Sequence, residues 1–77
     1  MTERELKHEF ATRLRRLMYK RGELNQKQLA ALSGISEVTI SYYRTEKLLP
    51  KTDNLVRLAH ALNCSIDELI PVDEITD

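Results

Sequence analysis

The segment SGISEVTISYYR, residues 33–44, gathers hydroxyl and carboxylate side chains that could form hydrogen bonds with another molecule. It also holds two adjacent tyrosines, in a chain that has only three tyrosines and one phenylalanine. Neighbouring residues on a helix do not face the same side, so the two rings cannot share a face. At about 100° per residue, Ile40 and Tyr43 lie together on one face of a helix that starts at Glu37. We therefore predict that Tyr43 packs in the core and that Tyr42 is displayed to solvent.

The opposite face of this helix has side chains suited to recognition. It presents, in chain order, Glu37, Val38, Ser41, Tyr42 and Thr45. Short polar side chains and a tyrosine can contact base edges and phosphates. The Glu37 carboxylate could accept a hydrogen bond from cytosine, or it could only complement the positive end of the helix. Val38 could contact a thymine methyl group or be partly buried. An ordinary amphipathic helix with a solvated outer face explains the same pattern, so both interpretations stay open.

The sequence offers little for catalysis. No nucleophile, base and orienting group occur together, and there is no glycine-rich loop for a phosphate. His8 and His60 have no second ligand at metal spacing. The lone Cys64 cannot form an internal disulfide and is typical of a small core residue in a reducing cytoplasm. We therefore expect no enzyme activity, no metal and no cofactor.

The location expected from the sequence is the cytoplasm. No apolar run approaches the roughly 18 residues that a membrane-spanning helix needs. The first ten residues, MTERELKHEF, are too charged for a secretory signal. We therefore expect neither membrane insertion nor export.

The net charge of zero conceals an uneven distribution. Residues 13–51 contain nine Lys or Arg and three acidic residues, a net charge of +6. Residues 52–77 contain one Arg and six acidic residues, a net charge of −5. A basic middle mildly favours a polyanionic partner, although solvated helix faces would give the same count.

Capping residues and helix stops predict five short helices. Polar caps precede them at Thr2, Asn25, Ser36, Thr52 and Ser65. Stops follow near Gly22, Gly34, Thr45, Asn63 and Pro71. No segment alternates with the period of a strand. We expect a compact all-α domain over residues 1–70 and a short, frayed acidic tail over residues 71–77.

The second and third predicted helices are joined by SGIS, a tight turn at Gly34 followed by a helix capped at Ser36. This order of helix, turn and helix is the helix-turn-helix pattern, whose second helix enters the major groove of DNA. From Phe10 to Leu69 the chain resembles the Cro/repressor-type (XRE) helix-turn-helix family, in LNQKQLAALSGISEVTIS and NLVRLAHALNCSIDEL. The resemblance implies a five-helix, lambda-repressor-like DNA-binding domain that usually binds a palindromic operator as a homodimer.

The resemblance also assigns roles to residues. It implies a phosphate contact for Gln26, base-edge positions at Glu37, Val38 and Tyr42, and a backbone contact for Thr39. The loop with Lys47 and Lys51 is expected to follow the phosphates. The complete DNA-binding set indicated by the motif and the resemblance is Gln26, Lys27, Ser36, Glu37, Val38, Thr39, Ser41, Tyr42, Arg44, Thr45, Lys47 and Lys51.

Several positions depart from the family pattern. A common arginine and glutamate pair between the first and third helices is here Met18 and Arg44, so an apolar contact would replace it and leave Arg44 free for DNA. Glu46 replaces a usual glycine, which leaves the end of the third helix open. Lys51 stands where a serine cap is common, so we place the fourth cap at Thr52.

A shorter resemblance competes with this one. SGISEVTISYYRTEKLLP is similar to the mercury-resistance-regulator (MerR) pattern, in which a helix-turn-helix runs into paired tyrosines and a leucine-leucine-proline segment. The long first helix does not belong to that pattern, and no wing follows Pro50. Either resemblance implies a protein that binds DNA.

Two classes of function follow. The first is a sequence-specific transcriptional regulator, such as a phage-type repressor or Cro, a restriction-modification controller or a small chromosomal repressor. The second is an antitoxin or other protein-binding module that regulates its own gene through the motif.

The C-terminal region contains more aliphatic residues than a core of this size is expected to cover. Ile66, Leu69, Ile70, Val72 and Ile75 lie within ten positions of one another. An exposed apolar patch usually marks an interface. We therefore expect a homodimer interface formed by Ile66, Leu69, Ile70 and Val72. The alternative is that Ile70 and Val72 only cap the core of a single chain and that the remaining residues fray.

Overall fold

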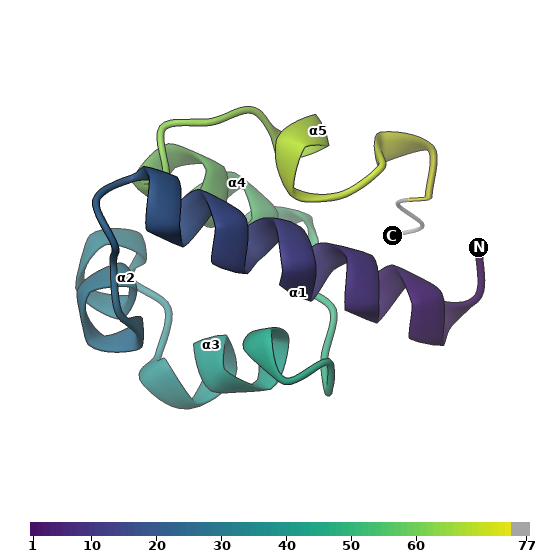
Figure 1. The fold of residues 1–77 in the computed structure, drawn as a ribbon, viewed down its shortest axis with the longest axis horizontal. Coiled ribbons are helices and arrows are strands. Elements are labelled where there is room, and N and C mark those ends of the chain that lie inside the picture. The colour runs from purple at the N-terminus through teal and green to yellow at the C-terminus, as the bar shows by residue number, and fades with distance from the viewer. Residues whose placement is uncertain (75–77) are drawn as a thin grey trace.

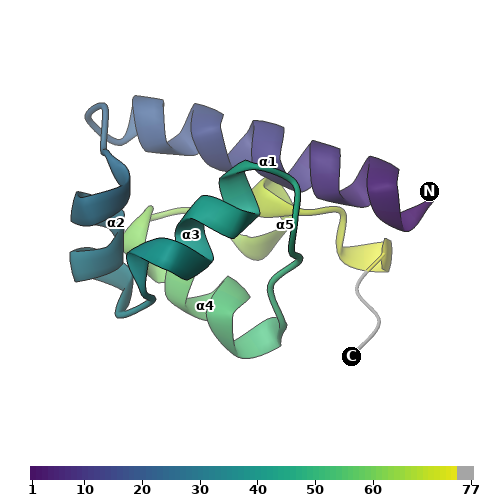
Figure 2. The same ribbon diagram turned by 90° about the horizontal axis from the view of Figure 1, so that it is seen from below.

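The computed structural model describes residues 1–74 and contains α-helices without strands over that range. The helices are α1 (Glu3–Lys20), α2 (Gln26–Ser33), α3 (Glu37–Arg44), α4 (Thr52–Ala61) and α5 (Ile66–Leu69), followed by a 3-10 turn, η1 (Val72–Glu74). Figure 1 shows the long α1 running along the molecule, with α3 on one side and α5 on the other. Seen from below in Figure 2, α3 lies in front, between α1 and α4. The predicted all-α, five-helix, lambda-repressor-like fold is confirmed.

The helices begin where their capping residues predict, with one exception. Capping boxes precede α1, α2 and α5, and Ser36 caps α3. The prediction that Thr52 caps α4 is wrong. Lys51 has the extended backbone of the capping residue, and Thr52 is already the first helical residue. A lysine side chain has no acceptor for the helix amides, and α4 accordingly has no side-chain cap.

Two helices end at non-glycine residues with left-handed backbone. Asn63, with φ of 51°, follows α4 as predicted. Glu46, with φ of 65°, follows α3 and occupies the position of the usual glycine. The amides of Glu46 and Lys47 donate to the carbonyls of Tyr43 and Tyr42 at 3.4 and 2.9 Å. This pair of bonds is the Schellman motif, so α3 ends at Arg44 in the way that the family glycine would end it.

The core lies between α1 and the other helices. Its largest fully buried side chains are Phe10, Leu14, Leu29, Ile40, Tyr43, Leu55, Leu58 and Leu69. The rings of Phe10 and Tyr43 meet edge to face, with centroids 5.5 Å apart and planes at 82°. This contact fixes α3 against α1.

The C-terminal aliphatic residues are more buried than the sequence suggests. Leu69 is 0% and Ile70 3% exposed, so both belong to the core of the single chain and not to an exposed patch. Ile66 is partly buried and Val72 is exposed. Residues 72–74 form η1 where a frayed tail was expected, and Ile75 lies outside the described residues. The predicted interface therefore loses Leu69 and Ile70, because α5 packs both against α1 and α4.

Candidate nucleic-acid interface

The turn between α2 and α3 is held by Gly34 and by the buried residues on either side of it, Ser33 and Ile35. Gly34 has φ of 75° and ends α2, and its amide donates to the Ala30 carbonyl at 2.9 Å. The Ser33 hydroxyl, buried in the turn, accepts from the Ile35 amide at 3.2 Å. Ile35 is buried in the core. These contacts determine the angle at which α3 leaves α2.

One face of α3 is anchored in the core, as the helical periodicity predicts. Ile40 is fully buried and Tyr43 is 2% exposed. The Asn54 side chain on α4 donates a hydrogen bond to the Tyr43 hydroxyl at 2.9 Å. Burial raises the pKa of Tyr43, and the bond from Asn54 acts in the opposite direction without cancelling it. Tyr43 therefore stays a neutral phenol that joins α3 to α1 and α4.

The other face of α3 is open to solvent. Val38 is 61% and Tyr42 44% exposed, and Glu37 and Thr45 are also exposed. The Lys47 ammonium lies 5.8 Å from the centroid of the Tyr42 ring, within range of a cation–π contact. Tyr42 thus stands on the surface beside a cation, and Tyr43 beneath it is a core residue. The predicted division between the two tyrosines is confirmed.

The small hydroxyl residues of α3 are partly used by the helix itself. The Ser36 hydroxyl accepts from the Thr39 amide at 3.2 Å and donates to the Thr39 hydroxyl at 2.9 Å. The Thr45 hydroxyl donates to the Ser41 carbonyl at 2.8 Å. Ser41 and Thr39 are half-buried. These side chains remain at the edge of the exposed face, where their free lone pairs or hydroxyl protons can meet a partner.

The cations of the predicted set have two different environments. Lys27, Lys47 and Lys51 are exposed. Arg44 is half-buried, and its Nη1 donates to Oε1 of Gln26 at 2.9 Å. The expectation that the loss of the helix-one arginine leaves Arg44 free is therefore wrong. With no carboxylate opposite it, the guanidinium turns to the first residue of α2.

Two residues with structural roles at the interface were missed by sequence reasoning. Arg15, to which the sequence analysis assigns no individual role, donates from Nη1 to the Arg44 carbonyl at 2.8 Å and so closes the end of α3. Asn54 orients the Tyr43 hydroxyl. Neither role has a signal in the local sequence, because each depends on which helices lie side by side.

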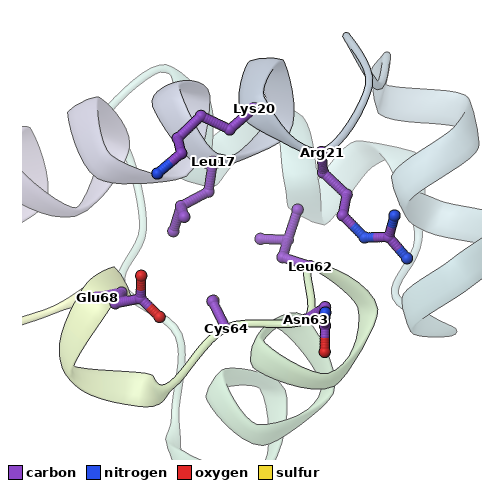
Figure 3. Close-up of a pocket in the computed structure, with 7 residues that line it drawn as sticks. All are labelled: Leu17, Lys20, Arg21, Leu62, Asn63, Cys64 and Glu68. Carbon is purple, nitrogen blue, oxygen red and sulfur yellow. The ribbon is translucent and has the colours of Figure 1, made fainter.

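A hollow on another part of the surface lies where the end of α1 faces the loop between α4 and α5 (Figure 3). Leu17, Leu62 and Cys64 line it, together with the charged Lys20 and Glu68. Burial, with added repulsion from Glu68 and Asp67, raises the pKa of the Cys64 thiol. The thiol is therefore protonated near neutral pH and is a poor nucleophile or metal ligand. Within residues 1–74, no group of His, Cys, Asp and Glu side chains could hold a metal ion.

A helix-turn-helix family model matches residues 16–69, which include α2, the turn, α3 and α4. The chain belongs to the helix-turn-helix family. The match supports the Cro/repressor-type (XRE) resemblance seen in the sequence, and it makes this helix-turn-helix protein a DNA-binding regulator. Neither the search of curated proteins nor that of solved structures gave a match. In the described part of the chain, no helix is long and apolar enough to cross a membrane.

Proposed function

We propose that this helix-turn-helix protein is a cytoplasmic, sequence-specific transcriptional regulator that binds a palindromic operator as a homodimer. The observation that carries the proposal is the division of α3. Its inner face is fixed by Ile40 and Tyr43, and its outer face presents Val38 and Tyr42 to solvent directly after the turn. A helix held in this way can enter the major groove without losing its place in the core. The DNA-binding domain comprises residues 1–70, and residues 71–77 form an acidic tail.

We assign base readout to the middle of the outer face and phosphate contact to its edges. Glu37, Val38, Ser41 and Tyr42 face the bases. Contacts to the phosphates come from Gln26, Lys27, Ser36, Thr39, Thr45, Lys47 and Lys51. The three lysines are exposed, which suits contact with a polyanion. The acidic residues near the C-terminus lie beyond this region in the sequence.

The homodimer is proposed because a single recognition helix reads too few base pairs to select an operator within a genome. With Leu69 and Ile70 buried, the interface must use the remaining apolar surface. Ile66 lines a hollow with Val56, which is exposed on α4. We place the interface at Val56, Ile66 and Val72. To read two half-sites one turn of DNA apart, the recognition helices of such a dimer must lie about 34 Å from each other.

Selection of bound duplexes from a random library, followed by titration at several salt concentrations, tests the proposal. We expect a palindromic site and a fall in affinity of about 10³- to 10⁵-fold between 50 and 200 mM salt, as for roughly six to ten phosphate contacts. Sedimentation equilibrium should show a concentration-dependent dimer that Ile66→Glu weakens. No selected site together with a flat salt response would contradict DNA regulation. A strict monomer that binds DNA as one unit would contradict the dimer alone.

A further inference from the structure

We infer that Arg44 is a positioning residue that orients the Gln26 side chain toward a DNA phosphate, an inference that rests on the proposed DNA binding. Gln26 is the first residue of α2 and Arg44 the last of α3, 18 positions apart in sequence. Their side chains meet at 2.9 Å between Arg44 Nη1 and Gln26 Oε1. The contact thus joins the two helices of the motif.

The chemistry of the pair decides which end of the carboxamide stays available. A guanidinium has only donors, so it can bind the carboxamide only through the oxygen. The NH2 group of Gln26 must then point away from Arg44. This group can donate two hydrogen bonds and cannot accept one. A phosphate oxygen accepts hydrogen bonds and cannot donate one, so the presented group matches it. A freely rotating glutamine would present its oxygen as often as its nitrogen and would repel the phosphate in that orientation.

Arg44 is itself held in place and carries an unneutralised charge. Its carbonyl accepts from Arg15 on α1 at 2.8 Å, which fixes the last turn of α3. Its Nε is buried without a hydrogen-bond partner among the described residues. In that part of the chain no carboxylate forms an ion pair with it. The guanidinium therefore adds positive charge beside Gln26, where it both orients the carboxamide and favours the approach of a phosphate.

A double-mutant cycle separates positioning from a direct contact of Arg44 with DNA. The variants are Gln26→Ala, Arg44→Met and their combination, titrated with a duplex selected from the random library. If Arg44 acts through Gln26, the two losses are not additive. We expect Gln26→Ala to weaken binding about tenfold in the original chain but less than about twofold in the Arg44→Met background, a coupling in the range measured for contacting residues.

Lys47→Met is the matched control, because it also removes one positive charge at the interface but its side chain lies over Tyr42. We expect Gln26→Ala to keep its tenfold effect in that background. Additive losses for Arg44 and Gln26 would overturn the inference and assign Arg44 its own phosphate contact. Failure of the original chain to bind any duplex would instead overturn the proposed function.

A spectroscopic measurement on the free protein tests the orientation directly. In ¹⁵N-labelled protein, the side-chain NH2 of Gln26 should be ordered, and Arg44→Met should bring its signals to those of a mobile glutamine. An unchanged Gln26 signal in a folded variant would contradict the inference. If Arg44→Met does not fold, Arg44→Lys keeps the charge and the aliphatic stem but lacks the planar guanidinium. The same cycle with Arg44→Lys should then still show non-additive losses.

Discussion

Replacement of the two adjacent tyrosines by alanine should separate stability from DNA binding. Tyr43 is 2% exposed, packs edge to face on Phe10 and accepts a hydrogen bond from Asn54. Large-to-small changes of buried aromatic residues cost about 3–5 kcal/mol, because apolar contacts are lost and a cavity remains. The aromatic pair contributes about 0.5–1.5 kcal/mol beyond its buried area. We therefore expect Tyr43→Ala to lower the free energy of unfolding by at least about 3 kcal/mol.

That loss is large for a domain of this size. Small domains are stabilised by only about 5–15 kcal/mol in total. Each kcal/mol lowers Tm by about 4–8 °C in a domain of 60–100 residues, so Tyr43→Ala should lower it by at least about 12 °C. Tyr42 is 44% exposed, and its contact with Lys47 at 5.8 Å is solvated. Tyr42→Ala should therefore change the free energy of unfolding by no more than about 0.5 kcal/mol.

Thermal unfolding followed by circular dichroism and titration with the selected duplex measure the two effects. Tyr42→Ala should melt close to the original protein and bind the duplex more weakly. Tyr43→Phe is the control for the core position, because it keeps the ring and removes only the hydroxyl partner of Asn54, at a cost of about 1 kcal/mol. A stable Tyr43→Ala variant with an unstable Tyr42→Ala variant would refute the orientation of α3 on which the recognition surface depends.

Three further predictions concern the turns and the thiol. Glu46→Gly should raise the free energy of unfolding, measured by urea titration, by about 0.5–1 kcal/mol. A φ of 65° costs an L-residue about 1–2 kcal/mol, and the contact with His8 that is lost is exposed and therefore weak. A decrease in the free energy of unfolding would contradict this reasoning. Gly34→Ala should lower Tm by several degrees, since φ is 75° and an added Cβ would lie 3.3 Å from Arg57 Nη1. An unchanged Tm would show that the turn relaxes without cost. Because burial raises its thiol pKa, Cys64 should react with Ellman's reagent at pH 8 more slowly than in the urea-unfolded chain, and equal rates would count against this.

The pattern of apolar residues and caps predicts most of the fold because these signals act locally. Capping boxes at Thr2, Asn25 and Ser65 were recognised from spacing alone and occur in the structure. The faces of α3 follow from the helical period, which does not depend on the neighbouring helices. The sequence places the cap of α4 one residue too late. Lys51 adopts the extended backbone of a capping residue, but a lysine side chain cannot accept from a helix amide, so its residue type does not mark the position.

The C-terminal region shows where local pattern becomes insufficient. In the sequence, Leu69 and Ile70 look like surplus aliphatic residues of a short helix. In the structure they are core residues, because α5 returns to pack against both α1 and α4. Whether an aliphatic side chain is buried depends on how much area the other helices leave uncovered, which no single segment specifies.

The sequence by itself determined the helices, the turn at Gly34 and the outward position of Tyr42, since each depends on residue types a few positions apart. It also determined the family, through a pattern that extends over most of the chain. Only the tertiary structure decided which distant side chains meet. The bonds from Arg15 to the Arg44 carbonyl and from Arg44 to Gln26 join α1, α3 and α2 across 29 and 18 positions. A guanidinium can reach any of several acceptors from a given helix position, and the packing of the three helices selects the one that it binds.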